Sequence, residues 1–100
     1  MLTATKSNQQ TYAEIVSRII KSQEEIIGPL AVQQAQKVNG LRVSWQSKKI
    51  EVQGNAPQVI DELVKQYETL FGSIAVETCR DVTKQLVSKL SEEERPKSLI

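Results

Sequence analysis

The residues best suited to chemistry in this chain are glutamates that stand a few positions before two glycines. Glu24 and Glu25 precede Gly28, and Glu68 precedes Gly72. Paired carboxylates act as general acid and base where their surroundings set their pKa values apart. No motif places a second acid beside either group, and nothing in the sequence raises a carboxylate pKa. We therefore expect these glutamates to lie on solvated helix faces, with no catalytic role.

The chain contains one cysteine, Cys79, and no histidine. Histidine is the commonest general base and the commonest ligand of transition metals, so its absence removes the usual catalytic sets and metal sites. Cys79 has no imidazole to activate it and falls on a predicted inward helix stripe, so we expect a small core residue and not a nucleophile. We therefore predict that the protein is not an enzyme and has no catalytic residue, cofactor or metal.

A small basic group lies on a predicted hairpin, where Arg42, Lys48 and Lys49 stand close to Trp45. A basic hairpin beside an aromatic ring is one way to bind nucleic acid. Three charges neutralise few phosphates, however, and charged hairpin tips are common. We keep contact with nucleic acid through these three residues as the alternative function.

A repeat organises the whole chain. Shifted by 44 positions, residues 15–38 align with residues 59–82, and six of the 24 pairs are identical. Each copy reads as an amphipathic helix, a glycine and a second helix, with Gly28 and Gly72 in register. A single glycine suits a helix end and lacks the run of exposed amides that a phosphate-binding loop needs. We predict two structurally equivalent units, produced either by duplication or by convergence on one pattern.

Apolar spacing predicts four helices, over residues 12–27, 29–38, 56–71 and 74–90. Thr11 with Glu14 fits a capping box, Asn55 fits the N-cap of the third helix, and Ser73 suits the cap of the fourth. On the short second helix, Leu30, Ala31, Ala35 and Val38 are expected to face inward. Inward stripes are also predicted on the three longer helices. The stripes comprise Tyr12, Ile15, Val16, Ile19, Ile20, Ile26 and Ile27; Val59, Ile60, Leu63, Val64, Tyr67, Leu70 and Phe71; and Ala75, Cys79, Val82, Leu86 and Leu90.

Between the two copies, residues 41–45 and 50–53 alternate between apolar and polar side chains, which predicts two antiparallel strands. A lone hairpin is barely stable in water, so its apolar face must lie on the helices or on a partner. Trp45 belongs either to the core or to an interface. The interface candidates on this face are Val43, Trp45, Ile50 and Val52.

Length and composition indicate one ordinary globular domain of 100 residues with a net charge of +1, so no overall field selects a polyanion. We expect a flexible arm over residues 1–10, a globular domain over residues 11–91 and a frayed tail over residues 92–100. No signal-peptide pattern is visible, and no apolar run approaches the ~20 residues of a membrane span. We therefore expect a soluble, cytoplasmic protein that does not bind membranes.

The predicted fold is α+β and mostly helical, in the order ααββαα. Two helix–glycine–helix hairpins bracket one antiparallel β-hairpin, with an internal pseudo-two-fold between the halves. The predicted function is a non-enzymatic protein–protein interaction or regulatory module, acting as a homodimer and on an unidentified protein partner. A small nucleic-acid-binding accessory protein is the alternative, and an enzyme comes third.

Overall fold

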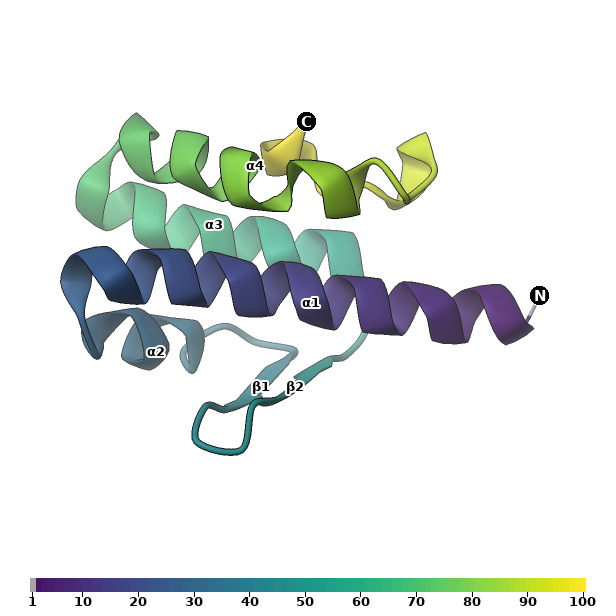
Figure 1. Ribbon diagram of the computed structural model, residues 1–100, viewed down its shortest axis with the longest axis horizontal. Helices are drawn as coiled ribbons and strands as arrows, with labels where there is room; N and C mark the ends of the chain where they lie inside the picture. The colour runs from purple at the N-terminus through teal and green to yellow at the C-terminus, as the bar shows by residue number, and fades with distance from the viewer. Residues whose placement is uncertain (1) are drawn as a thin grey trace.

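The computed structural model describes the backbone of residues 2–100 and the side chains from residue 8 onward. These residues form four α-helices and one two-stranded antiparallel sheet (Figure 1). The predicted order ααββαα and the α+β class are confirmed. The elements are α1 (Leu2–Ile27), α2 (Leu30–Ala35), β1 (Leu41–Ser44), β2 (Lys49–Val52), α3 (Ala56–Phe71) and α4 (Ser73–Val87), followed by the 3-10 turns η1 (Glu92–Glu94) and η2 (Lys97–Leu99).

Helix α1 is the central element of the fold. It packs most extensively along α4 and also contacts α2, α3 and β2. In Figure 1, α3 and α4 lie on one side of α1, and α2 with the hairpin lies on the other. The core therefore forms around α1, and most of its large, fully buried hydrophobic side chains come from α1 and α3. They include Ile15, Val16, Ile19, Ile20, Ile60, Leu63, Val64 and Tyr67, all at most 1% exposed.

The start of α1 differs from the prediction. The helix already begins at Leu2, so the capping box expected at Thr11 is wrong, and residues 2–10 are helical where a flexible arm was expected. The reason is a contact far along the chain. The Asn8 side-chain amide donates to the carboxylate of Glu94, and the Tyr12 hydroxyl donates to the Glu94 backbone oxygen at 2.7 Å. Met1 lies outside the described residues.

The C-terminal residues 92–100, predicted to be a frayed tail, fold back onto α3 and α4. Pro96 and Leu99 are buried there. The carboxylate of Asp61 accepts hydrogen bonds from the Ser98 backbone N–H at 3.0 Å and from the Ser98 hydroxyl at 2.6 Å. The prediction fails because burial of Leu99 and hydrogen bonds to a carboxylate 37 positions before Ser98 fix this segment.

The predicted helix boundaries are confirmed in part. Asn55 caps α3 as expected, because its side-chain oxygen accepts a hydrogen bond from the Gln58 N–H at 3.2 Å. Ser73 does not cap α4: the capping position is Gly72, and no side-chain cap bond is made there. Helix α2 is shorter than predicted, ending at Ala35 in hydrogen-bonded turns. Val82 is only half-buried, although it was expected on the inward stripe.

The hairpin has the predicted facing. Leu41 pairs with Val52 and Val43 with Ile50, so the apolar residues share one side of the sheet. Leu41 and Val52 are buried, and Val43 and Ile50 pack against the core. The helices therefore cover most of this face.

Candidate protein interaction surface

The two glycine turns share a positive φ angle and the same backbone hydrogen bond. Gly28 and Gly72 have φ angles of +69° and +77°. Each glycine N–H donates to the backbone oxygen of the residue four positions earlier, Gly28 to Glu24 at 2.8 Å and Gly72 to Glu68 at 2.7 Å. The ψ of Gly72 is −164°, a region that essentially only glycine populates. The predicted glycine breaks are therefore confirmed, whereas equivalence of the whole units and the pseudo-two-fold stay predictions, because α2 has 6 residues and α4 has 15.

The two turns also lie at the same end of the molecule, because α1 and α3 both end there and α2 and α4 both begin there (Figure 1). The Tyr67 hydroxyl donates to the backbone oxygen of Ala31 at 2.6 Å, which joins the last turns of α3 to the first turn of α2. Repeat and fold together therefore place equivalent residues of both copies on one surface.

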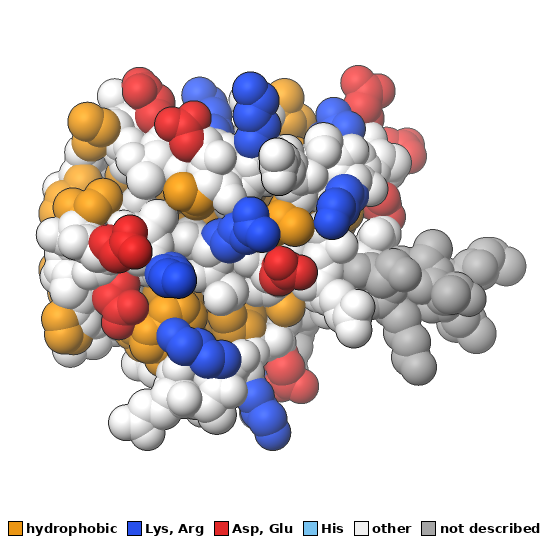
Figure 2. Space-filling view, viewed as in Figure 1, with side chains coloured by type: hydrophobic (Ala, Val, Ile, Leu, Met, Phe, Trp, Pro, Cys, Tyr) orange, Lys and Arg blue, Asp and Glu red, His pale blue; other side chains and the backbone are white. Residues whose placement is uncertain are grey.

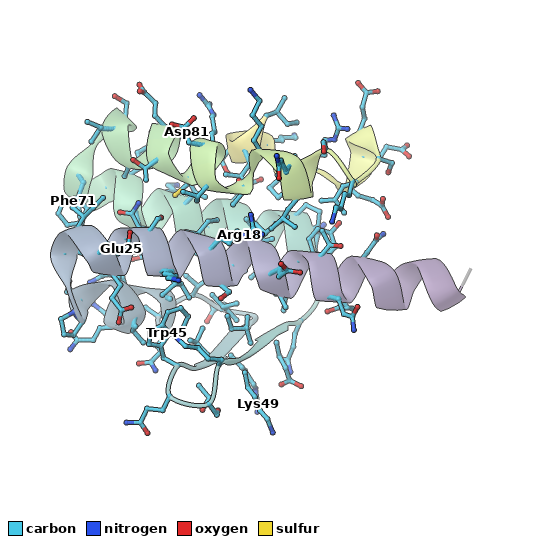
Figure 3. All side chains as sticks on the ribbon, in the orientation of Figure 1. Arg18, Glu25, Trp45, Lys49, Phe71 and Asp81 are labelled. Atoms are coloured by element: carbon cyan, nitrogen blue, oxygen red, sulfur yellow. The ribbon has the colours of Figure 1, made fainter. Side chains whose placement is uncertain are left out.

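This surface exposes large hydrophobic side chains from all four helices. Ile26 is 66% exposed and Ile74 is 69% exposed. Figure 2 shows hydrophobic side chains gathered at the same end, and Figure 3 labels Phe71 among them. We call this surface the apolar end. Its residues are Ile26, Leu30, Leu70, Phe71 and Ile74.

The expectation that Ile26, Leu30, Leu70 and Phe71 face inward is therefore wrong. Their helical spacing is right, but each sits in the first or last turn of its helix, at the end of the molecule where all four helices end or begin. Sequence reasoning missed the apolar end as a surface. The repeat held the available signal, because apolar residues flank both glycines in register, Ile26 with Leu70 and Leu30 with Ile74.

Within the two chain segments that form the apolar end, every charged residue is acidic. Residues 22–36 and 66–79 contain no lysine or arginine. Glu25 lies beside this end in Figure 3, and Glu77 stands one helical turn from Ile74 on the same face. The acidic rim comprises Glu24, Glu25, Glu68 and Glu77, of which all but the half-buried Glu24 are exposed.

Trp45 connects the hairpin to the acidic rim. Its indole N–H donates to both carboxylate oxygens of Glu24, at 3.1 and 3.2 Å. The ammonium of Lys48 lies 3.7 Å from the centre of the Trp45 ring, a cation–π contact. Trp45 is half-buried and packs against the core. Of the predicted interface candidates, Val52 is buried, and Val43, Trp45 and Ile50 keep part of their surface in solvent.

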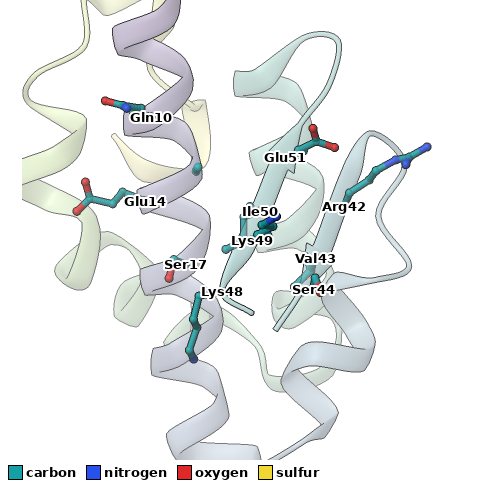
Figure 4. A pocket seen from close by; sticks show the side chains of 11 residues that line it. Gln10, Glu14, Ser17, Arg42, Val43, Ser44, Lys48, Lys49, Ile50 and Glu51 are labelled. Atoms are coloured by element: carbon teal, nitrogen blue, oxygen red, sulfur yellow. The ribbon is translucent and has the colours of Figure 1, made fainter. Parts of the chain in front are cut away.

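An open groove of about 840 Å³ runs between α1 and the hairpin (Figure 4). Its lining brings together the predicted nucleic-acid contacts Arg42, Lys48 and Lys49. Glu14 and Glu51 line the same groove, and Glu51 pairs in register with Arg42. The groove is therefore of mixed charge.

Cys79 is fully buried on α4, as predicted. The Gln23 side-chain amide lies 3.9 Å from its sulfur. Burial raises the pKa of the Cys79 thiol to about 12, so the thiol stays protonated at neutral pH. It therefore serves as a small core residue.

The described part of the chain contains neither a metal-binding cluster nor a membrane-spanning helix. Among its cysteine, aspartate and glutamate side chains, no group of three or more is placed to hold a metal ion. Over residues 2–100, no helix combines the length and the apolar character needed to cross a membrane. Comparison with known proteins finds no matching family model, curated protein or solved structure.

Proposed function

We propose that the protein is a non-enzymatic interaction module that binds a protein partner through the apolar end. The observation that supports this is the gathering of five exposed hydrophobic side chains from four helices on one surface. Single exposed hydrophobic residues are ordinary, but contiguous patches mark binding sites on soluble domains. Both glycine turns contribute equivalent residues, so the same repeat that builds the fold builds this surface.

The energy available from covering the apolar end is large for so small a protein. Burying one Leu, Ile or Phe side chain completely contributes about 1.5–3 kcal/mol, and the five side chains are between 38% and 69% exposed. Covering them with a partner would therefore contribute about 4–8 kcal/mol before the costs of association. Association itself costs about 4 kcal/mol or more, and micromolar binding requires a net of about 8 kcal/mol, so a partner must also make contacts beyond these five side chains.

The test uses immobilised parent protein, Phe71→Ser and Ile74→Ser, with Ile100→Ser as the matched control. Ile100 is 68% exposed and lies outside the apolar end. Each is incubated with extract of the native cell, and bound proteins are quantified by mass spectrometry. A partner should be retained by the parent and by Ile100→Ser, and lost from both apolar-end variants, while all four proteins melt cooperatively. Identical retention on all four would contradict the proposal.

Nucleic-acid binding is the second candidate, supported by the convergence of Arg42, Lys48 and Lys49 on one groove. It has weaker support than the apolar end, because Glu14 and Glu51 share that groove and the Lys48 ammonium is already placed over Trp45. Retention on a polyanion column that falls steeply with salt and disappears in Arg42→Ala/Lys49→Ala would favour this candidate.

A further inference from the structure

We infer that the partner of the apolar end presents hydrophobic side chains flanked by lysine and arginine, as a basic amphipathic helix does. The inference rests on the proposed function and specifies its ligand. It is carried by the charges around the apolar end, which have one sign in the segments that form it.

Four glutamates and no basic residue lie within residues 22–36 and 66–79, the turns that carry the exposed hydrophobic side chains. The basic residues Lys21, Lys37, Lys65 and Arg80 border these two segments, about five to seven positions from the nearest exposed hydrophobic residue, whereas the four glutamates stand about one to three positions from one. Glu25, Glu68 and Glu77 are exposed, and the charged groups of a bound partner would come within a Debye length, about 8 Å, of them. Lysine or arginine beside the partner's apolar face would meet opposite charge, whereas glutamate or aspartate there would be repelled.

The same charges disfavour a second copy of this chain at the apolar end. A two-fold dimer buries the same patch of both subunits, so two acidic rims would face each other. Like charges placed together in an interface oppose association. A helix is the simplest occupant, because its apolar residues at i, i+3, i+4 and i+7 can contact several turns of this surface while its polar face carries the basic residues.

The experiment measures binding of three fluorescein-labelled peptides of about 18 residues, or five helical turns. All three share one leucine face, and their polar faces consist of lysine, glutamine or glutamate. Fluorescence anisotropy should show the Leu/Lys peptide binding the parent at least about tenfold more tightly than the Leu/Gln peptide, with the Leu/Glu peptide weakest. Phe71→Ser and Ile74→Ser should each weaken Leu/Lys binding about tenfold or more.

The charge contribution is isolated with two matched triple variants. Glu25→Gln/Glu68→Gln/Glu77→Gln changes three exposed rim residues, and Glu62→Gln/Glu92→Gln/Glu93→Gln changes three exposed glutamates elsewhere. The first variant should lose most of the preference for Leu/Lys over Leu/Gln, and the second should keep it. An equal loss in both would mean general attraction to an acidic protein, and would overturn the inference.

Two further outcomes separate this inference from the proposed function. If all three peptides bind equally and Ile74→Ser abolishes binding of each, the apolar end binds partners but the charge inference is wrong. If no peptide binds, the inference is overturned, and the extract experiment alone decides the proposed function; if binding survives in both apolar-end variants, the peptides bind elsewhere and the inference is overturned as well. Sedimentation completes the test: a parent that self-associates, beside an Ile74→Ser variant that does not, would assign the surface to a second copy and overturn the inference.

Discussion

The Tyr67 hydroxyl donates a 2.6 Å hydrogen bond to the backbone oxygen of Ala31, and both residues are fully buried. Tyr67 occupies the position in the second repeat that Gln23 occupies in the first. Gln23 points its amide at the sulfur of Cys79 on α4. Each repeat therefore uses the same position to reach the second helix of the other repeat, and the two units interlock.

Replacement of Tyr67 by phenylalanine should lower the free energy of unfolding by about 1–2 kcal/mol. The ring stays buried, but the Ala31 oxygen loses its hydroxyl donor. Urea denaturation measures the effect. The control is Tyr12→Phe, which removes a bond to the Glu94 backbone in a partly buried position and should cost less. A Tyr67→Phe variant as stable as the parent would show that the Tyr67–Ala31 bond adds nothing beyond ring packing.

Stability should decline at high pH through Cys79. Burial raises the pKa of its thiol in the folded protein from 9.0 to about 12. Above pH 9 the unfolded chain loses this proton while the folded chain keeps it, so the contribution is complete below pH 9 and is lost as the pH rises toward 12. One pH unit above 9 should cost about 1 kcal/mol.

Urea titrations of the parent and of Cys79→Ala at pH 8 and pH 10 check this sign. The parent should lose more stability between the two pH values than the variant does. Burial also raises the pKa of Tyr67 from 10.0, so some decline above pH 10 should persist in the variant. A parent and a variant with the same pH dependence would contradict the assignment to Cys79.

Two glycines with positive φ should respond differently to alanine. A Cβ added at Gly72 meets nothing within 4 Å, so Gly72→Ala should cost only backbone strain, on the order of 1–3 kcal/mol. A Cβ at Gly40 would come within 2.9 Å of both the Gln53 backbone oxygen and a Val59 methyl. Gly40→Ala should therefore be clearly the more destabilising variant in thermal melts. The reverse order would show that the strand end at Gly40 adjusts freely.

The C-terminal segment should depend on Asp61. Its carboxylate accepts hydrogen bonds from the backbone and hydroxyl of Ser98, and bonds to a charged acceptor contribute about 1.5–3 kcal/mol. Asp61→Ala should lower stability by about that amount and speed hydrogen exchange over residues 97–100. The neighbouring exposed Glu62 supplies the control, since Glu62→Ala removes a carboxylate that makes no such bond to Ser98. Unchanged exchange in Asp61→Ala would mean that packing of Leu99 alone holds the segment.

Homodimer formation through the hairpin stays a prediction. Val43 and Ile50 keep part of their surface in solvent, and β1 has only four residues. Light scattering at several concentrations should show a dimer for the parent, and a folded Val43→Lys variant should dissociate at higher concentration. A parent that remains at monomer mass would end this prediction without affecting the apolar end.

Local chemistry explains which parts of the fold could be predicted from the sequence. The glycine breaks, the Asn55 cap and the pairing of Val43 with Ile50 depend on residues close together in the chain, and all three are confirmed. The early start of α1 depends on Glu94, more than 80 positions away, and no local pattern reports such a contact. The apolar periodicity likewise predicted the helix face on which Leu70 lies, but not that this last turn of α3 stays partly uncovered.

The candidate site was predicted least well, for the same reason. A hydrophobic residue type at helical spacing does not reveal whether its side chain is exposed or buried, so Ile26 and Ile19 cannot be distinguished in the sequence. What distinguishes them is the cover supplied by another helix. The hairpin residues were expected at an interface because a two-stranded sheet needs cover, and α1 and the core supply most of that cover within the chain.

The interlocking of the repeats also determines when the protein can fold during its synthesis. Because α1 packs chiefly against α4, the first helix has no complete cover until residues 73–87 have left the ribosome. At a synthesis rate of about 5–20 residues per second, roughly 3–12 s pass between the synthesis of α1 and that of α4. Neither repeat can act as an independent folding unit during that interval. The nascent chain therefore leaves Ile15, Ile19 and Ile20 without their full cover for seconds.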